Sequence, residues 1–231
     1  MSQVRIGIYG GTFNPIHLGH LRAAEAVAEQ LGLARVVFVP SGQPPHKPEG
    51  DLADPIAAAD LRLRWVRDAI AGNPRFALSP LEVERDGPSY LVDTLTALRR
   101  ERASERIVFL LGCDAFAELG SWREPRRLLT LADFAVTTRP PEREGNLRDW
   151  LPDCVRGDVD LSPDGRVATH READTRIELV EIRALDVSAT DVRARIRSGR
   201  SLRYLVPESV REAIEQSGAY PGQGAAMAQD E

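Results

Sequence analysis

The spacing of apolar and polar positions changes several times along the first 140 residues. Short β-branched runs predict strands at residues 4–9, 35–39, 76–83, 107–111 and 133–137. Between them, apolar residues recur at helical spacing over residues 21–31, 61–70 and 91–98. Strands that alternate with helices are typical of parallel crossovers. The pattern therefore predicts an α/β fold with a Rossmann-like, doubly wound parallel sheet of five to six strands.

The pattern loosens after residue 141. Residues 142–175 are charged and are interrupted by proline and glycine, which predicts a surface excursion. Residues 176–183 predict a last strand, and two short helices follow at about 189–198 and 207–217. We therefore expect one domain over residues 1–220 and a disordered tail over the Gly- and Ala-rich residues 221–231.

Composition narrows the class of protein. The chain has 231 residues, and its 35 acidic and 30 basic side chains give a net charge of −5, which argues against a general nucleic-acid binder. Its two cysteines cannot build a disulfide scaffold. No signal peptide is visible, and no apolar run approaches the ~20 residues that cross a bilayer. We expect a cytoplasmic protein without a membrane or nucleic-acid partner, and a homo-oligomer is compatible with these features.

Residues 10–20 are the strongest candidate for chemistry. They read G-G-T-F-N-P-I-H-L-G-H and connect the first predicted strand to the first predicted helix. Gly10 and Gly11 lack Cβ atoms, so their backbone can approach a phosphate closely, and the helix N-terminus favours an anion. His17 and His20 are three residues apart and project from one face of the first helical turn, where both can donate hydrogen bonds to a phosphate.

Three other interpretations of this segment are weaker. It could be a plain turn followed by a solvated helix cap. It has neither the G-x-G-x-x-G spacing of a dinucleotide fingerprint nor the lysine of a P-loop. A zinc site from His17, His20 and His46 would lack any supporting carboxylate.

The segment resembles the signature of nucleotidylyltransferases that carry the H-x-G-H motif. Further segments narrow the resemblance to the bacterial nicotinate-nucleotide adenylyltransferases, and they lie at residues 41–47, 87–95, 111–122, 187–193 and 205–207. These segments read S-G-Q-P-P-H-K, G-P-S-Y-L-V-D-T-L, L-G-C-D with a later S-W, V-S-A-T-D-V-R and L-V-P. The matches span residues 4–217 in the family's order, so the resemblance covers nearly the whole chain.

The resemblance implies that AMP is transferred from ATP to nicotinate mononucleotide, giving deamido-NAD and pyrophosphate, with Mg²⁺ accompanying ATP. Its catalytic residues would be His17, His20, Lys47 and Arg193. ATP would also contact Gly10, Gly11, Thr12, Phe13, Gly19, Ser188 and Thr190. Nicotinate mononucleotide would contact Ser89, Tyr90, Asp93, Thr94, Gly112, Asp114, Trp122, Arg123 and Arg139. No metal ligand is expected from the chain itself.

Several of these residues have an equally good structural role. Ser188 and Asp191 form the pattern of a capping box, which alone explains a helix start. Asp114 could bind a ribose or cap a helix, and Trp122 could stack on a flat ring or pack in the core. Lys47 lies in a proline-stiffened segment that could also be a plain surface loop.

Two positions depart from the family pattern. Leu91 stands where the family often has threonine, and Arg123 stands where it often has an aromatic residue. Arg123 could replace the lost hydrogen bond to the pyridine carboxylate, or it could face solvent and pair with Glu124. We expect the acid to be preferred over the amide. The rival functions are a sister adenylyltransferase for nicotinamide mononucleotide or phosphopantetheine, and a non-enzymatic nucleotide sensor.

Overall fold

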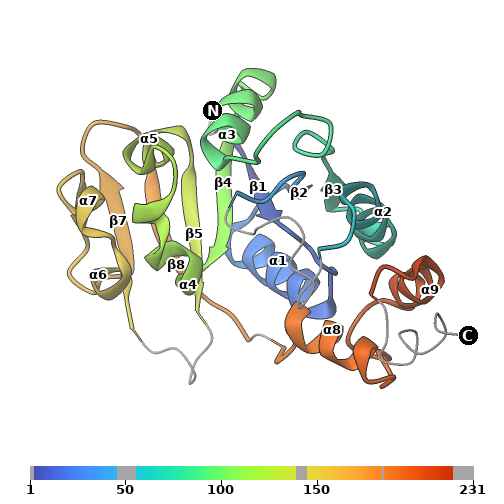
Figure 1. Ribbon diagram of the computed structural model, residues 1–231. Helices are drawn as coiled ribbons and strands as arrows, with labels where there is room; N and C mark the ends of the chain where they lie inside the picture. The colour runs from blue at the N-terminus through green and yellow to red at the C-terminus, as the bar shows by residue number, and fades with distance from the viewer. Residues whose placement is uncertain (1–2, 46–55, 139–144, 184, 221–231) are drawn as a thin grey trace, which may run out of the picture.

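The computed structural model describes residues 3–45, 56–138, 145–183 and 185–220. Its strands form one sheet in the order β3-β2-β1-β4-β5-β8-β7-β6 (Figure 1). Their bounds are β1 Val4–Gly11, β2 Arg35–Pro40, β3 Phe76–Leu78, β4 Glu105–Gly112, β5 Asp133–Thr138, β6 Val159–Leu161, β7 Val167–His170 and β8 Arg176–Glu181. β1 to β5 and β8 pair in parallel, whereas β7 and β6 add to the end of the sheet in antiparallel fashion. The predicted α/β class is confirmed, but the sheet is larger than the five to six strands expected.

β1 lies between β2 and β4, and the order of the strands reverses between β1 and β4. Ile6 of β1 aligns with Arg35 of β2 on one side and with Ile107 of β4 on the other. The crossovers that leave β1 and β4 therefore diverge, and they open a crevice beyond the carboxyl ends of these two strands. Open parallel sheets bind ligands at this position.

Helices cover both faces of the sheet (Figure 1). One face carries α1 Leu18–Leu31, α2 Ala59–Ile70, α8 Ala189–Arg197 and α9 Glu208–Ser217. The other carries α3 Leu91–Glu101, α4 Cys113–Ala117, α5 Pro125–Leu131, α6 Leu147–Trp150 and α7 Asp153–Arg156, with the 3₁₀ turn η1 Leu119–Ser121. Along β4, Val108 and Leu110 pack toward the first face, and Ile107 and Phe109 toward the second. This two-sided burial explains why the parallel strands are apolar throughout.

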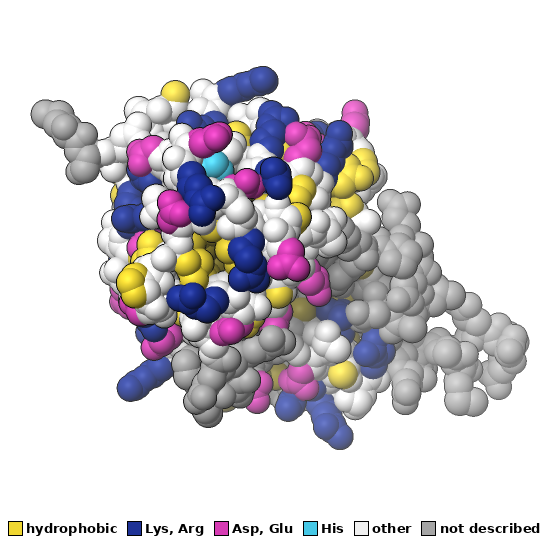
Figure 2. Space-filling model, turned by 90° about the vertical axis from the view of Figure 1, so that its left-hand side faces the viewer, with side chains coloured by type: hydrophobic (Ala, Val, Ile, Leu, Met, Phe, Trp, Pro, Cys, Tyr) yellow, Lys and Arg dark blue, Asp and Glu magenta, His cyan; other side chains and the backbone are white. Residues whose placement is uncertain are grey.

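The described part of residues 142–175 is not a surface excursion, so that prediction was wrong. It supplies β6, β7, α6 and α7, and Leu147, Leu151 and Val155 are buried in the core. Leu147 begins α6, Leu151 caps its C-terminus and Val155 lies in α7, so both short helices and the turn between them are anchored in the core. Figure 2 views this end of the molecule, where positive and negative side chains intermingle around apolar patches. Ion pairs such as Arg171–Asp160 account for much of that charge.

Two smaller differences have clear causes. The strand predicted over residues 76–83 ends at Leu78, because the chain turns at Pro80, whose carbonyl accepts from the N–H of Val83. Helices α4 and α5, with five and seven residues, are too short to produce a readable period. Within the described part of the chain, no helix has the length and apolar content to cross a membrane.

Candidate active site

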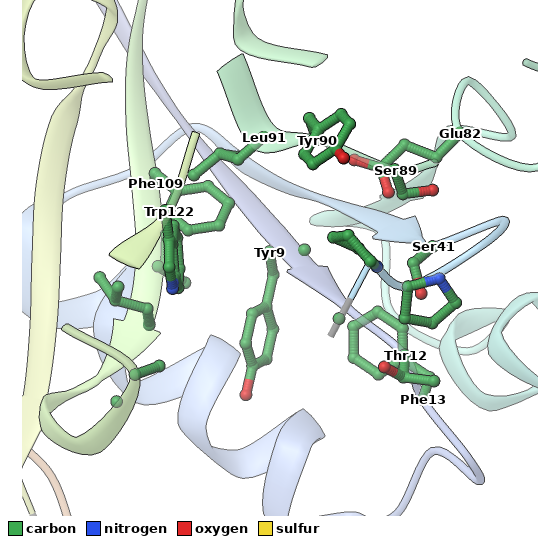
Figure 3. A pocket seen from close by; sticks show the side chains of 18 of the residues that line it. Tyr9, Thr12, Phe13, Ser41, Glu82, Ser89, Tyr90, Leu91, Phe109 and Trp122 are labelled. Carbon is green, nitrogen blue, oxygen red and sulfur yellow. The ribbon is translucent and has the colours of Figure 1, made fainter. Parts of the chain in front are cut away.

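A cavity of about 390 Å³ lies in the crevice beyond β1 and β4. Four segments build its wall: the end of β1 with the loop that follows, the loop after β2, residues 82–91, and the end of β4 with α4 and the loop before α5. The lining residues are Tyr9, Gly10, Gly11, Thr12, Phe13, His20, Ser41, Pro44, Pro45, Glu82, Ser89, Tyr90, Leu91, Phe109, Leu110, Leu111, Gly112, Ala115, Trp122, Arg123 and Leu128. In Figure 3, Trp122 and Phe109 lie on one side, Thr12, Phe13 and Ser41 on the other, and Tyr9 between them.

The two histidines of the H-x-G-H segment occupy different positions. His17 is the N-cap of α1 and is 5% exposed, whereas His20 lies on the cavity wall. The backbone N–H of His17 donates to Nδ1 of His20 at 3.2 Å, and the two rings stack with their centroids 3.7 Å apart. Because Nδ1 of His20 accepts this bond, the neutral ring carries its proton on Nε2. His20 is thereby fixed as a hydrogen-bond donor through Nε2.

Gly19 allows this arrangement because it has no side chain. A Cβ atom at this position would lie 2.9 Å from Nδ1 of His17 and 3.2 Å from the carbonyl oxygen of Val187. The first turn of α1 can therefore pack against the His17 ring and against the chain leading into α8. Gly19 shapes the site without lying on the described part of the cavity wall.

A buried hydrogen-bond network supports the wall around Ser89. The backbone N–H of Gly42 donates to Oγ of Ser89 at 2.9 Å, and the hydroxyl of Thr94 donates to Oε1 of Glu82 at 2.6 Å. Burial raises the pKa of the Glu82 carboxyl, although hydrogen bonds from Thr94 and Ser89 and the charge of Arg85 oppose that shift. The predicted substrate residue Thr94 thus faces Glu82 and supports the wall from behind.

A further part of the cavity wall is flat, apolar and half-exposed. Trp122, Tyr90 and Leu91 line it, and the Arg123 guanidinium lies 4.7 Å from the centroid of the Tyr90 ring. Arg123 also lies 3.9 Å from Asp93 and 4.0 Å from Glu124. It therefore lines the cavity, as one alternative from the sequence predicted, and also lies near Glu124, as the other predicted. Its side chain is 53% exposed.

Helix α8 reaches the loop that precedes α1. Ser188 is its N-cap and accepts from the N–H of Asp191, whose own carboxylate pairs with Arg195. Arg193 is buried and donates to the carbonyl oxygen of Asn14 at 2.7 Å and to the hydroxyl of Thr190 at 3.2 Å. The Asn14 side-chain oxygen also accepts from the hydroxyl of Tyr220 and from the N–H of Ala57.

Comparison with known proteins identifies the family. Residues 8–195 match the cytidylyltransferase-like family. A protein of Trichlorobacter lovleyi named "Probable nicotinate-nucleotide adenylyltransferase" is 41% identical over 94% of this chain and 99% of its own length. A protein of the same name from Thermomicrobium roseum is 42% identical, over 94% of this chain and 91% of its own. The chain belongs to the nicotinate-nucleotide adenylyltransferase family.

A solved structure shares the fold of this chain at a much lower sequence identity than the relatives above. The Plasmodium falciparum nicotinic acid mononucleotide adenylyltransferase, complexed with NaAD, has a TM-score of 0.70 and 16% identity, covering 94% of this chain and 97% of that one. The two chains therefore share the fold.

The structure brings together many, but not all, of the residues that the family resemblance singles out. The cavity wall includes Gly10, Gly11, Thr12, Phe13, His20, Ser89, Tyr90, Gly112, Trp122 and Arg123. Within the described ranges, the wall does not include His17, Gly19, Asp93, Thr94, Asp114, Ser188, Thr190 or Arg193. Asp114 is exposed in the first turn of α4, where an acidic side chain suits the helix N-terminus. Lys47, Arg139 and the zinc candidate His46 lie outside the described residues.

Several residues of the cavity wall were not predicted from the sequence as site residues. They are Tyr9, Ser41, Glu82 and Phe109. Tyr9 and Phe109 lie in the carboxyl-terminal halves of the adjacent strands β1 and β4 at the switch point, and that position is a signal that could have identified them. Glu82 stands in an otherwise apolar run, which is a weaker signal.

Proposed function

We propose that this chain transfers AMP from ATP to nicotinate mononucleotide, forming deamido-NAD and pyrophosphate in NAD biosynthesis. The observation that carries the proposal is one cavity that joins an anion-binding end to a flat apolar end. Gly10–Thr12 and the Nε2 donor of His20 lie at the first end, and Trp122 and Tyr90 at the second. The names and identities of the curated relatives support it.

The reaction needs positioning and charge stabilisation more than acid–base chemistry. The 5′-phosphate oxygen of nicotinate mononucleotide attacks the α-phosphorus of ATP, a new phosphoanhydride bond forms, and the bond to the β-phosphate breaks. The nucleophile is already an anion, and pyrophosphate leaves with the electron pair, so no proton must be removed. Catalysis of such transfers rests on alignment and on donors aimed at the developing charge.

His20 is the described side chain best placed to stabilise the transition state. The bond from the His17 backbone holds the ring and orients Nε2 as a donor before substrate binds. Such preorganised donors act without reorganisation during the reaction. His17 contributes through its backbone and through stacking against the His20 ring. Direct contacts of Lys47 and Arg193 with the outer phosphates stay predictions.

Mg²⁺ fits this site as part of the nucleotide substrate. Over the described ranges, no group of three or more His, Cys, Asp or Glu side chains could hold a metal ion. Mg²⁺ commonly binds through phosphate oxygens and retains several waters, so it would arrive with ATP and neutralise part of the triphosphate charge.

The half-exposed end of the cavity is proposed to bind the pyridine ring. Trp122 offers a flat face for stacking, whereas the backbone N–H groups of Tyr90 and Trp122 already donate to the carbonyls of Pro88 and Leu119. Arg123 adds a positive charge at the same end, which favours the acid over the amide. Asp93 and Glu124, both within 4.0 Å of Arg123, weaken that preference.

The test is an acceptor panel. Purified protein is incubated with ATP, Mg²⁺ and, separately, nicotinate mononucleotide, nicotinamide mononucleotide and phosphopantetheine, and pyrophosphate release is followed. We expect the highest kcat/KM with nicotinate mononucleotide. A higher value with either other acceptor would assign the chain to a sister activity. ATP binding without transfer to any acceptor would favour a nucleotide sensor.

A further inference from the structure

Arg62 is a fully buried arginine in α2, at 1% exposure, and no part of the reaction chemistry above uses it. It lies three and four residues before Trp65 and Val66, on the helix face that packs into the core. An arginine in this position is costly because a charge must be removed from water. Burial lowers its pKa, but a guanidinium stays protonated at physiological pH.

Each nitrogen of the Arg62 guanidinium donates to a backbone carbonyl. Nε bonds to Ala57 at 2.8 Å, Nη1 to Thr12 at 2.7 Å and Nη2 to Gly42 at 2.9 Å. These carbonyls belong to three separate segments: the entry to α2, the loop after β1 and the loop after β2. One planar side chain therefore holds three segments in a fixed relation to one another.

Two of the three segments form neighbouring parts of the cavity wall. Thr12 is on the wall itself, and Gly42 follows Ser41, which is also on it. Gly42 connects Arg62 to Ser89, because its carbonyl accepts from Arg62 and its N–H donates to Oγ of Ser89. It must also be glycine, since a Cβ atom there would lie 2.3 Å from the carbonyl oxygen of Glu82.

We propose that Arg62 is a positioning residue for AMP transfer, which holds the Gly10–Thr12 loop and the Gly42–Ser89 junction at the separation that the two substrates require. The inference rests on the proposed function. Arg62 also contributes to stability, because its loss would take these donors from three buried carbonyl oxygens. Two of its three acceptors, Thr12 and Gly42, belong to segments that form the cavity wall, so the same bonds set the shape of the site.

The experiment compares Arg62→Met and Arg62→Lys with the wild type. Arg62→Met keeps the length and loses every hydrogen bond, whereas Arg62→Lys keeps the charge without the planar fork. Arg64→Met is the matched control, because Arg64 is in the same helix but is exposed and pairs only with Asp60 among the contacts described. The measurements are kcat, KM for each substrate, and the melting temperature.

We expect Arg62→Met to lower kcat by roughly 10- to 100-fold, the effect of a displacement of about 1 Å in the reacting groups. KM should change less than kcat, Arg62→Lys should recover part of the loss, and Arg64→Met should match the wild type. A kcat within twofold of the wild type in Arg62→Met would overturn the proposal. If Arg62→Met does not fold, Arg62→Lys decides by the same criterion: unchanged kcat overturns the proposal, and lowered kcat at an unchanged melting temperature supports it.

A double-mutant cycle adds a readout that general destabilisation would not produce. If Arg62 acts on Ser89 through Gly42, the combined loss in Arg62→Met/Ser89→Ala should be smaller than the product of the two single losses. Strictly multiplicative losses would remove Ser89 from the proposed route. Should the wild type prefer another acceptor, the proposed substrate is wrong, and the same variant ratios measured with that acceptor still decide the role of Arg62.

Discussion

The two ends of the cavity are held in place by different means. At the phosphate end, buried polar groups fix the backbone: Arg62 holds Thr12, and Arg193 and Tyr220 hold Asn14. At the pyridine end, the wall consists of half-exposed side chains, with Trp122 partly buried and the Arg123 side chain 53% exposed.

This difference suggests a division of labour. Buried donors in fixed positions can stabilise developing charge without moving, which suits the chemistry that any acceptor phosphate would require. A charged group that shares solvent with Asp93 and Glu124 contributes only a small free energy, typically below about 1 kcal/mol. Changes at the phosphate end should therefore alter the rate, whereas changes at the pyridine end should alter the choice of acceptor.

The largest effect is expected from His20→Ala. Loss of one preorganised donor costs about 2.7–4 kcal/mol in the barrier, so kcat should fall by roughly 10²- to 10³-fold. ATP affinity, measured by calorimetry, should fall much less. His170→Ala is the control, since His170 lies in β7 at the far end of the sheet. Equal losses in kcat and in ATP affinity would make His20 a binding residue only.

A smaller effect, on a different parameter, is expected from Trp122→Ala. Stacking of a base on an aromatic side chain is worth about 1–3 kcal/mol, so KM for nicotinate mononucleotide should rise by roughly 5- to 150-fold. KM for ATP should stay close to that of the wild type. Trp122→Phe retains a flat face and should restore most of the affinity. A parallel rise in both KM values would contradict the proposed position of the pyridine ring.

Arg123→Ala should alter selectivity by a smaller factor. Because Arg123 is half-exposed and lies near two carboxylates, we expect the acid-to-amide ratio of kcat/KM to fall by about 1.5- to 5-fold. Arg127→Ala is the control, since Arg127 is also exposed and contacts Glu124. If the wild-type ratio is large and Arg123→Ala leaves it unchanged, Arg123 does not contribute to the selectivity.

The smallest effect concerns stability and pH at Glu82. Burial raises the pKa of its carboxyl in the folded state, so above the ordinary value of 4.5 the folded protein retains a proton that the unfolded chain releases. Stability from this group is full below that value and is lost as pH rises through the folded-state pKa. The Tm of Glu82→Gln relative to that of the wild type should therefore increase as the pH rises above 4.5. The exposed neighbour Glu84, changed to Gln, should show no such trend.

Sequence periodicity predicts the long elements of this fold well and the short ones poorly. The helices at residues 18–31, 59–70 and 91–101 contain several turns of regular apolar spacing, and all three were predicted. β6 and β7, with three and four residues, are too short to show a period. Their residues Val159 and Ala168 are buried in the same core cluster as Leu147 and Val155. Tertiary packing determines these elements more than local propensity does.

The candidate site divides in a similar way. The contiguous segment at residues 10–20 predicted the end of the cavity that we propose binds the phosphates, because consecutive residues there share one loop and one helix start. Arg62 and Glu82 were missed, since their importance arises from chain segments that meet only in the folded protein. One local signal existed for Arg62. Its charged side chain lies on the apolar face of a predicted helix, and a charge in that position requires buried hydrogen-bond partners.

The hydrogen bond between Asn14 and Tyr220 has a consequence for biosynthesis. The two residues are 206 positions apart, and at 5–20 residues per second the ribosome needs about 10 to 40 s to make the chain between them. Asn14 lies in the loop that follows the first strand, whereas Tyr220 follows helix α9. A nascent chain that has not yet reached Tyr220 therefore lacks this buried hydrogen bond to the loop between β1 and α1.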